Sequence, residues 1–262
     1  MANMTSSRRA SEVVGILASS SIEELPALLD LYRDDPRAQV SQACARASRR
    51  LEKELAERNR VKGMYDLMRE LGGAGTIVGV DEVGRGSVAG PLTVCAVCLP
   101  DDPLVWGIND SKKLSPARRE ILAAHILDTA RAVGICHIPP HTIDEVGMSE
   151  SLRRAVRGAV LDTGLSPDCV LMDGNPLGAV ANEKDVVKGD SKIASIAAAS
   201  IVAKVTRDEM MVEYDAEYPG YHLAESKGYA SPDHIAAIKK RGLSPLHRVS
   251  FCGNFLEQDS LF

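Results

Sequence analysis

Short apolar runs rich in β-branched residues recur along the chain and predict buried strands. The first run is built by Ile77, Val78 and Val80, and two adjacent carboxylates, Asp81 and Glu82, interrupt it. Further strands are predicted at residues 92–99, 132–138 and 169–172, with a weaker one at 186–190. A glycine-rich turn joins the first two runs, so this part of the chain predicts a strand, a tight turn and a second strand.

Apolar residues at helical spacing predict helices before and between these strands. Ser21 and Glu24 form a capping box ahead of one helix, which Asp34-Asp35-Pro36 ends. Further helices are expected at residues 11–18, 38–71, 116–131, 149–163, 191–214 and 232–241, whereas 141–148 is a loop or a short helix. Strands mixed with helices indicate an α/β fold.

Glycines at positions 72, 73 and 75 predict a flexible joint and a domain boundary near residue 72. The expected parts are an N-terminal helical extension (1–71), an α/β core (72–214), a C-terminal helical segment (215–257) and a short tail (258–262). The middle of the extension is locally basic through Arg46, Arg49, Arg50, Lys53, Arg58, Arg60 and Lys62. These cations form either a solvated helix face or an auxiliary contact to nucleic acid.

Composition narrows the class of protein. Over 262 residues, 45% hydrophobic and 26% charged content are ordinary for a soluble globular protein, and 4% aromatics leave the core to aliphatic residues. The formal net charge of -5 disfavours coating of nucleic acid by bulk charge but allows a local basic groove. No signal peptide and no apolar run of about 18 residues are visible, so we expect a cytoplasmic protein without membrane spans. Its six cysteines are expected to be buried thiols.

Carboxylates end several of the predicted strands. Asp173 and Asp190 each follow an apolar run, as Asp81 and Glu82 do. Converging carboxylates suit a hydrolase in which two Mg²⁺ or Mn²⁺ ions clamp the oxygens of a displacement at phosphorus. Taken singly, Asp173 fits a turn and Asp190 fits a helix N-cap, but neither alternative explains the adjacent pair. Because neighbouring strand residues point to opposite faces, the pair converges only if the strand bends or bulges, or if one acid acts through backbone and water.

The turn after the first strand reads Gly84-Arg85-Gly86 and continues to Gly90. It is not a dinucleotide-binding fingerprint, because its spacing is G-x-G-x-x-x-G and a strand follows it instead of a helix. Glycines on both sides of an arginine let backbone N–H and C=O groups come close to a ligand. That arrangement suits recognition of a sugar hydroxyl and a phosphate, and the 2′-OH distinguishes RNA from DNA.

The segment Asp81-Glu82-Val-Gly-Arg-Gly86 resembles the signature of the ribonuclease HII family. The resemblance covers about residues 76–252, in order and with family-like spacings. The further motifs are Asn109-Asp-Ser-Lys-Lys-Leu114, Met172-Asp-Gly-Asn175, Lys188-Gly-Asp-Ser-Lys192, Ala197-Ala-Ala-Ser-Ile-Val-Ala-Lys-Val-Thr-Arg-Asp208, Lys227-Gly-Tyr229 and His247-Arg-Val-Ser-Phe251. The sister family, ribonuclease HIII, usually has Gly-Thr-Gly at the turn, so Arg85 speaks against it.

The resemblance implies a ribonuclease H-like fold, with a mixed central sheet flanked by helices, and a catalytic two-metal site. The ligands of its Mn²⁺ or Mg²⁺ ions would be Asp81, Glu82, Asp173 and Asp190. The residues that read the 2′-OH at an RNA–DNA junction would be Gly84, Arg85 and Gly86, while Tyr229 would stack on the adjacent deoxyribose. The implied phosphate contacts are Lys192, Ser200, Lys204 and Arg207, with surface ion pairs to Asp208 or Glu209 as the alternative.

The reaction implied by the resemblance is endonucleolytic cleavage of RNA within a duplex with DNA. The cut would fall 5′ to a ribonucleotide and leave 3′-OH and 5′-phosphate ends, with single ribonucleotides in DNA as the special substrate. Ribonucleotide removal and RNA primer degradation would follow from that activity. Two other classes stay open: a hybrid-binding protein without catalysis, and another phosphoryl-transfer enzyme on the same fold.

The last residues, Gln258-Asp-Ser-Leu261-Phe262, resemble the clamp-binding peptide of bacterial replication and repair proteins, with Asp259 where that peptide has leucine. Leu261 and Phe262 would dock in an apolar pocket of the sliding clamp, and the alternative is that they fold back on the core. We expect a monomer that binds RNA/DNA hybrids and DNA duplexes containing ribonucleotides.

Overall fold

The computed structural model of the protein describes residues 8–256, and for Leu256 it describes the backbone alone. The clamp-binding peptide predicted at 258–262 lies outside the described residues. Among the helices of the described part, none is long and apolar enough to cross a membrane. The chain divides into two compact units, Met1–Lys62 and Gly63–Phe262.

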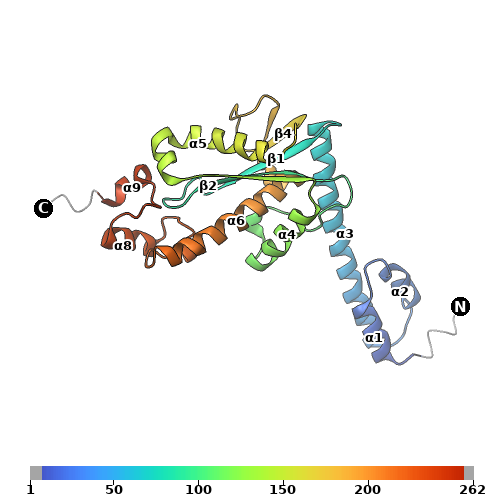
Figure 1. Cartoon of the computed structure of the whole chain (residues 1–262). Helices are drawn as coiled ribbons and strands as arrows, with labels where there is room; N and C mark the ends of the chain where they lie inside the picture. The colour runs from blue at the N-terminus through green and yellow to red at the C-terminus, as the bar shows by residue number, and fades with distance from the viewer. Residues whose placement is uncertain (1–7, 257–262) are drawn as a thin grey trace. The chain divides into compact units, whose positions relative to one another are not determined.

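A five-stranded sheet forms the centre of the larger unit (Figure 1). Its strands are β1 (Ile77–Val83), β2 (Leu92–Cys98), β3 (Ala132–Ile138), β4 (Cys169–Asp173) and β5 (Glu183–Val186). They lie in the order β3-β2-β1-β4-β5, with β2 antiparallel to both its neighbours and with β1, β4 and β5 parallel. The sheet is mixed, as predicted, and the carboxyl ends of β1 and β4 lie side by side.

Helices flank the sheet and extend beyond it. In the larger unit they are the end of α3 (Ala38–Gly72), α4 (Pro116–Thr129), α5 (Pro140–Asp162), α6 (Ala194–Glu217), α7 (Leu223–Ser226), α8 (Pro232–Arg241) and α9 (Val249–Leu256), with 3₁₀ turns η1 (Ser111–Lys113) and η2 (Gly189–Ser191). Ser115 caps α4, because its side chain accepts a hydrogen bond from the Arg118 N–H at 3.3 Å.

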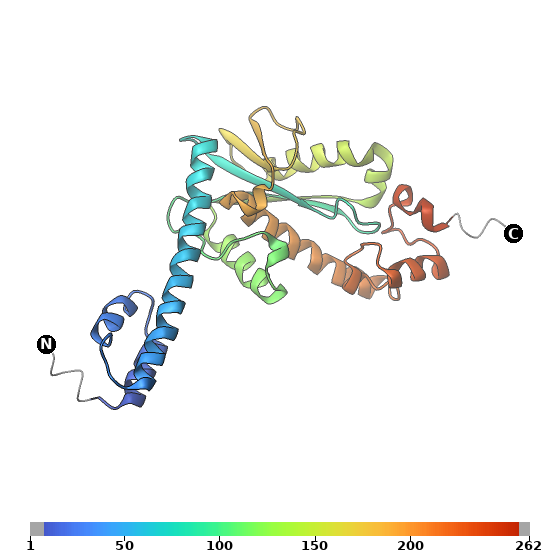
Figure 2. The same cartoon turned by 180° about the vertical axis from the view of Figure 1, so that it is seen from behind.

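The sheet lies between two helical layers, with α5 on one face and α6 and α4 on the other (Figures 1 and 2). The α5 face holds a large apolar cluster that includes Val78 and Val80 of β1. On the opposite face a Cβ at Gly79 would lie 2.3 Å from the backbone carbon of Ser195 in α6. This glycine therefore lets β1 pack directly on α6, on the face that also carries Asp81.

The C-terminal segment encloses the turn between β1 and β2. Val88 and Ala89 of that turn belong to an apolar cluster with Tyr221 and Ile238. Ala89 also forms an isolated antiparallel bridge with His247. The glycine-rich turn is thus fixed by residues more than a hundred positions away in the sequence.

The smaller unit consists of α1 (Ala10–Ser19), α2 (Leu25–Leu31) and the first part of α3. The predicted capping box is present, because the Ser21 N–H donates to the Glu24 carboxylate at 2.9 Å and the Glu24 N–H donates to Ser21 Oγ at 3.3 Å. Apolar side chains from all three helices form its core. The compact units divide inside α3, which continues to Gly72, so the boundary proposed near residue 72 stays a prediction.

Residues 141–148 adopt the short-helix alternative, whereas the weak strand predicted at 186–190 differs from the structure. The α5 helix begins at Pro140 and passes through a kink at Gly147, whose φ of 78° is a left-handed conformation that glycine adopts without strain. The weak strand predicted at 186–190 is wrong, because β5 ends at Val186 and Lys188 turns the chain with a φ of 58°. Asp190 consequently lies in the turn η2, before α6.

Candidate active site

A pocket of about 310 Å³ opens where β1 and β4 end, beside the glycine-rich turn and α6. It is lined by Asp81, Glu82, Val83, Gly84, Arg85, Gly86, Ser111, Lys112, Asp173, Ser200, Lys204 and Tyr229. Three of the four predicted carboxylates, the whole Gly-Arg-Gly turn and Tyr229 therefore meet in one cavity.

Asp81 and Glu82 both line this pocket although they are adjacent on a strand. The antiparallel ladder continues through them, with Asp81 opposite Cys95 and Glu82 opposite Val94, so no bulge occurs there. The pocket instead lies at the end of the strand, where residues from both faces border it.

The two acids are held in surroundings that disfavour their charge. Burial, followed by the nearby Glu82 carboxylate, raises the pKa of Asp81 to about 8. The Glu82 N–H, which donates to Asp81 Oδ1 at 2.8 Å, opposes that rise only in part. Burial also raises the pKa of Glu82, although the Arg85 guanidinium lies 3.5 Å from its carboxylate. The pair is therefore short of positive charge.

Asp173 and Asp190 come from two segments that one hydrogen bond connects. The Gly189 N–H donates to Asp173 Oδ1 at 2.6 Å, which brings η2 to the end of β4. Burial, then the neighbouring carboxylates Asp110 and Asp173, raises the pKa of Asp190. The alternative that Asp190 caps α6 is wrong, because Ile193 occupies the N-cap position.

These acids fit a hard divalent cation by their chemistry. Carboxylate oxygens are the ligands that Mg²⁺ and Mn²⁺ prefer, and the raised pKa values of Asp81, Glu82 and Asp190 mark a site where cationic charge would be stabilising. Within residues 8–256, no three His, Cys, Asp or Glu side chains stand close enough together to hold an ion as they are placed. Asp81, Glu82 and Asp173 line one pocket and Asp190 is not among its lining residues, so the four acids do not form a complete ligand shell.

The turn uses its glycines in two different ways. Gly84 has a φ of 84°, and a Cβ there would lie 2.3 Å from Arg207 Nε, so both backbone and packing require glycine. At Gly86 a Cβ would meet no protein atom within 4 Å, so the absent side chain leaves open space. Between them the Arg85 side chain is 62% exposed and free to reach a ligand.

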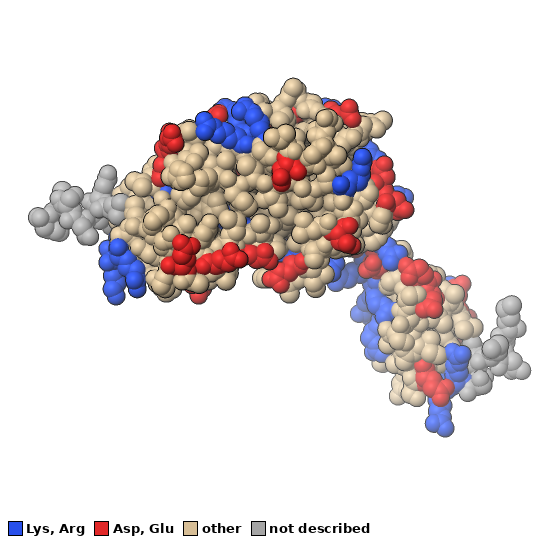
Figure 3. Space-filling model, viewed as in Figure 1, with Lys and Arg blue, Asp and Glu red and all other residues tan. Residues whose placement is uncertain are grey.

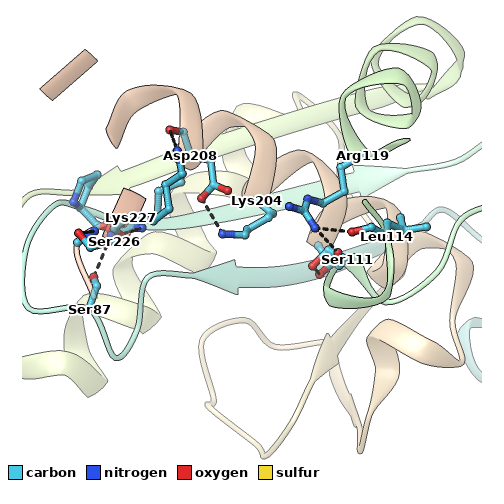
Figure 4. A network of polar contacts seen from close by, with 12 residues as sticks. Ser87, Ser111, Leu114, Arg119, Lys204, Asp208, Ser226 and Lys227 are labelled. Atoms are coloured by element: carbon cyan, nitrogen blue, oxygen red, sulfur yellow. Dashed lines mark hydrogen bonds and ion pairs between the residues drawn. The ribbon is translucent and has the colours of Figure 1, made fainter. Parts of the chain in front are cut away.

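The loop at residues 109–114 closes the other side of the pocket. Arg119 of α4 holds it by donating to Ser111 O at 2.9 Å and to Leu114 O at 2.7 Å (Figure 4). Ser111 Oγ lies 3.0 Å from Ser200 Oγ on α6. Lys112, which also lines the pocket, was assigned no role from the sequence. Its position inside the family-like motif Asn-Asp-Ser-Lys-Lys was the signal that could have identified it.

The predicted phosphate contacts on α6 and just before it lie in different surroundings. Lys204 lines the pocket and pairs with Asp208 at 2.7 Å, so the ion-pair alternative holds for it (Figure 4). Arg207 is wrong as a phosphate contact, because it is 0% exposed and its guanidinium donates to protein oxygens. Lys192 is exposed but does not line the pocket, and its ammonium donates to Val187 O at 2.7 Å.

Tyr229 stands at the edge of the pocket with 39% of its surface exposed. The Arg207 guanidinium lies 5.7 Å from the centre of its ring, within the range of a cation–π contact. The Tyr229 carbonyl oxygen lies 2.8 Å from His234 Nδ1 in α8. Its backbone is thus fixed from the C-terminal segment while its ring stays accessible.

A larger groove of about 430 Å³ lies beside this pocket and shares Lys204 with it. It is lined by residues of α4 and α6, among which acids and cations alternate, as in the pair Lys204–Asp208. Because those charges compensate one another, the smaller pocket with its uncompensated acids is the better candidate for chemistry.

Comparison with known proteins places the chain in a family. A profile described as Ribonuclease HII matches residues 78–254, and one described as Ribonuclease HII N-terminal domain matches residues 11–71. The protein named Ribonuclease HII from Lachnoclostridium phytofermentans is 44% identical over 226 residues, which cover 86% of this chain and 89% of that protein. Its namesake from Listeria monocytogenes serotype 4a is 44% identical over 219 residues, covering 83% and 84%.

Solved structures agree with this assignment. Ribonuclease H2 from Pyrococcus horikoshii is similar with a TM-score of 0.58 at 27% identity, covering 67% of this chain and 93% of that one. The ribonuclease HII solved in a complex with PCNA from Archaeoglobus fulgidus gives a TM-score of 0.59 at 28% identity, covering 66% and 94%. The predicted ribonuclease H-like fold is therefore confirmed, and the chain belongs to the ribonuclease HII family.

Proposed function

We propose that this protein is an endonuclease that cuts the RNA strand of RNA/DNA hybrids and nicks DNA duplexes 5′ to single embedded ribonucleotides. The observation that carries the proposal is the meeting of uncompensated carboxylates with the Gly-Arg-Gly turn and Tyr229 in one pocket. Family membership supports the reaction class, and the pocket supports the choice of substrate. The products would be 3′-OH and 5′-phosphate ends, and the roles would be ribonucleotide removal and primer degradation.

The metal ligands in this proposal are the four carboxylates Asp81, Glu82, Asp173 and Asp190. Bound Mg²⁺ or Mn²⁺ would supply an activated water and stabilise the charge that develops on the phosphate oxygens. Lys112 borders the same pocket and would attract the backbone phosphate into it, whereas Lys204 is paired with Asp208. Arg85, 3.5 Å from Glu82, links the acids to the turn that contacts the sugar.

The Gly-Arg-Gly turn and Tyr229 would select the ribonucleotide. The open space above Gly86 allows a nucleotide to approach the backbone closely, which a side chain would prevent. Backbone groups at that distance can bond to a 2′-OH, and the accessible ring of Tyr229 offers a surface for the next sugar. Both elements border the acids, so selection and cleavage would act on the same phosphodiester.

One assay separates this proposal from its alternatives. A labelled DNA duplex with one ribonucleotide is incubated with the protein and Mn²⁺ or Mg²⁺, beside an all-DNA duplex and an EDTA control. We expect one nick 5′ to the ribonucleotide, and none in either control. Binding without a nick would instead identify a non-catalytic hybrid-binding protein, and equal nicking of the all-DNA duplex would identify a DNA nuclease.

We further propose that the N-terminal unit adds an electrostatic contact to the duplex. Arg46, Arg49 and Lys53 are exposed and lie on one stripe of α3, where they form no ion pair with the described carboxylates. Arg58 and Arg60 of the same helix instead pair with glutamates. Figure 3 shows Lys and Arg gathered along one side of this unit. An unpaired cationic stripe suits a phosphate backbone.

The logarithm of the association constant for plain DNA duplex falls linearly with the logarithm of the salt concentration. Replacement of this stripe by alanine (R46A, R49A, K53A) should make that slope less steep by about 2 to 3. Arg33→Ala is the matched control, since Arg33 is an exposed cation of the same unit that pairs with Asp30. An unchanged slope in the triple variant would assign the stripe to a solvated helix face.

We also propose a partner and a cellular location for the protein. The tail at 258–262 would bind the bacterial sliding clamp, and its removal should abolish clamp pull-down without slowing cleavage of free oligonucleotides; an unchanged pull-down would refute this. The protein would act as a monomer in the cytoplasm. Its six cysteines are all free, which suits a reducing compartment.

A further inference from the structure

Two arginines lie fully buried beneath the glycine-rich turn. Arg207 on α6 and Arg248, just before α9, are both 0% exposed. Their hydrogen-bond acceptors in the described part of the chain are neutral oxygens, without a carboxylate among them. A buried guanidinium is costly unless its donors are satisfied, so each contact it makes is a strong constraint on the acceptor.

Arg207 ties together two segments that border the pocket. Its Nε donates to Pro91 O at 2.9 Å, and its Nη2 donates to Ser87 Oγ at 2.9 Å. The same Nη2 donates to Ala89 O at 3.1 Å. Its Nη1 reaches the other segment and donates to Lys227 O at 2.7 Å. One planar side chain thereby fixes the turn after β1 relative to the loop that carries Tyr229.

Arg248 holds the same turn from the C-terminal segment. Its Nη2 and Nε donate to Gly90 O at 2.9 and 3.1 Å, and its Nη1 donates to Arg85 O at 3.2 Å. The Arg248 N–H also donates to Val88 O at 2.8 Å. The carbonyl of Arg85 is therefore held from behind while its side chain points to solvent.

Backbone contacts complete the assembly. The N–H groups of Val88 and Ala89 donate to Gly228 O at 2.8 and 3.1 Å, and the Gly90 N–H donates to Leu246 O at 2.8 Å. The carboxylates are supported differently: Asp81 by the β1–β2 ladder and Asp173 by the Gly189 N–H. The elements that would select the sugar and those that would bind metal thus have separate supports.

We propose that Arg207 and Arg248 are positioning residues that hold the Gly-Arg-Gly turn and the Tyr229 loop in one fixed arrangement, and so set the preference for a ribonucleotide followed by a deoxyribonucleotide. This inference rests on the function proposed above. Lysine cannot replace either residue, because one ammonium lacks the planar fork of donors that bridges separate carbonyl groups.

The test compares Arg207→Lys and Arg248→Lys with the wild type. The selectivity is the ratio of kcat/KM for a ribonucleotide followed by DNA to that for one followed by RNA, each within a duplex. We expect it to fall about tenfold or more, the effect of losing one charge-assisted hydrogen bond that positions the substrate. The stabilisation by Mn²⁺ in thermal unfolding should stay at the wild-type level, because the acids keep their own supports.

Two further variants serve as a milder perturbation and as a control for this test. Ser87→Ala removes one acceptor of Arg207 and keeps both arginines, so it should fold and lower the selectivity to a smaller extent. Arg153→Gln is the matched control, since Arg153 donates to a backbone carbonyl, Leu177 O at 3.0 Å, away from the pocket. It should leave the selectivity unchanged.

Hydrogen exchange gives a readout that does not depend on cleavage. In the lysine variants the amides of residues 84–91 and 227–229 should exchange faster together, while those of β1 and β4 stay protected. If the wild type shows no sugar preference, the proposed function fails, and exchange alone then decides whether the arginines hold the loops. Unchanged selectivity and unchanged exchange would overturn the inference, as would a parallel loss of the Mn²⁺ response.

Discussion

A pair of buried acids and a pair of buried arginines lie at the same end of the larger unit. The two pairs differ in the hydrogen-bond partners that the protein provides for their charged groups. Asp81 and Glu82 are neighbouring acids in a buried pocket, where burial raises the pKa of both carboxyl groups. Arg207 and Arg248 are buried more completely, yet carbonyl and hydroxyl oxygens accept their N–H groups. Burial lowers the pKa of Arg248 to about 10, so it remains a cation at neutral pH.

This difference in hydrogen bonding distinguishes a site that would bind a cation from residues that only support the fold. A buried charge whose hydrogen bonds are complete is a fixed part of the fold, because nothing else is needed to stabilise it. A buried acid without such partners takes up a proton or needs a cation that the protein binds. The acids are therefore the proposed site of chemistry and the arginines a proposed scaffold, although the sequence shows both as charged residues in family-like motifs.

The largest expected effect comes from removing one uncompensated acid. Asp81→Asn should lower single-turnover cleavage by about 10³-fold or more, since a proposed metal ligand is lost, while duplex binding stays within a few-fold of wild type. Binding is measured by fluorescence anisotropy. Glu213→Gln, an exposed acid on α6 outside the pocket, should cleave at the wild-type rate. A loss below tenfold for Asp81→Asn would remove that acid from the chemistry.

The same variant should be more stable than the wild type when metal is removed. The pKa of Asp81 in the folded protein, about 8, is higher than that of an unfolded aspartate, about 3.9. The unfolded state therefore loses its proton first, and this acid lowers stability increasingly as pH rises from about 4 to 8. Urea unfolding in EDTA at pH 8 should show Asp81→Asn above the wild type.

Removing a buried arginine whose hydrogen bonds are complete should instead lower the stability of the protein. Arg248→Met should lower the free energy of unfolding by about 3 kcal/mol, because Gly90 O and Arg85 O lose their donors in a buried place. Urea unfolding at pH 7 measures it, with Arg153→Gln as control at less than about 1 kcal/mol. A variant as stable as the wild type would show that the buried cation is not part of the scaffold.

A buried histidine pair offers a smaller, pH-dependent comparison. His234 Nε2 and His247 Nε2 lie 3.1 Å apart, so one must donate and the other accept. Because the Ser244 N–H donates to His247 Nδ1 at 2.9 Å, His247 is neutral and donates from Nε2, and His234, which accepts, is neutral as well. Burial lowers the pKa of His247 to about 4 and also lowers that of His234. The folded state binds fewer protons than the unfolded one, so stability is complete above about pH 6.5 and declines as pH falls toward 4.

For His247 the expected loss is about 2 kcal/mol at pH 5 relative to pH 7.5. Urea unfolding at both pH values measures it, and His247→Asn should flatten the dependence. A wild-type protein equally stable at both values would show that the pair is protonated in the folded state.

The sequence was sufficient to identify site residues that belong to short local motifs. The adjacent acids after an apolar run, Asp173 at the end of a short strand and the Gly-Arg-Gly turn were all identified, and the structure brings them to one pocket. Such features are readable because they depend on residues within a few positions of one another. The order of strands and helices indicated only the α/β class, whereas the mixed sheet was expected from the resemblance to the ribonuclease HII family.

What the sequence could not show depends on distant contacts. The resemblance implied that Arg207 contacts phosphate, as Lys204 would, but loops from residues 84–91 and 227–229 cover it in the fold. Asp190 reads as a helix cap until the bond from Gly189 to Asp173 draws it to the acids. Burial by remote segments decides whether a charged residue binds a ligand or the protein itself.

The most direct test of this difference is thermal unfolding at pH 8 with Mn²⁺ or with EDTA, for the wild type and for Asp81→Asn. The account predicts that Mn²⁺ raises the melting temperature of the wild type by about 5 °C, as expected for a site that is filled well above its dissociation constant. The increase should be lost, or reduced to about 1 °C, in Asp81→Asn. No increase in the wild type, or an equal increase in both proteins, would contradict it.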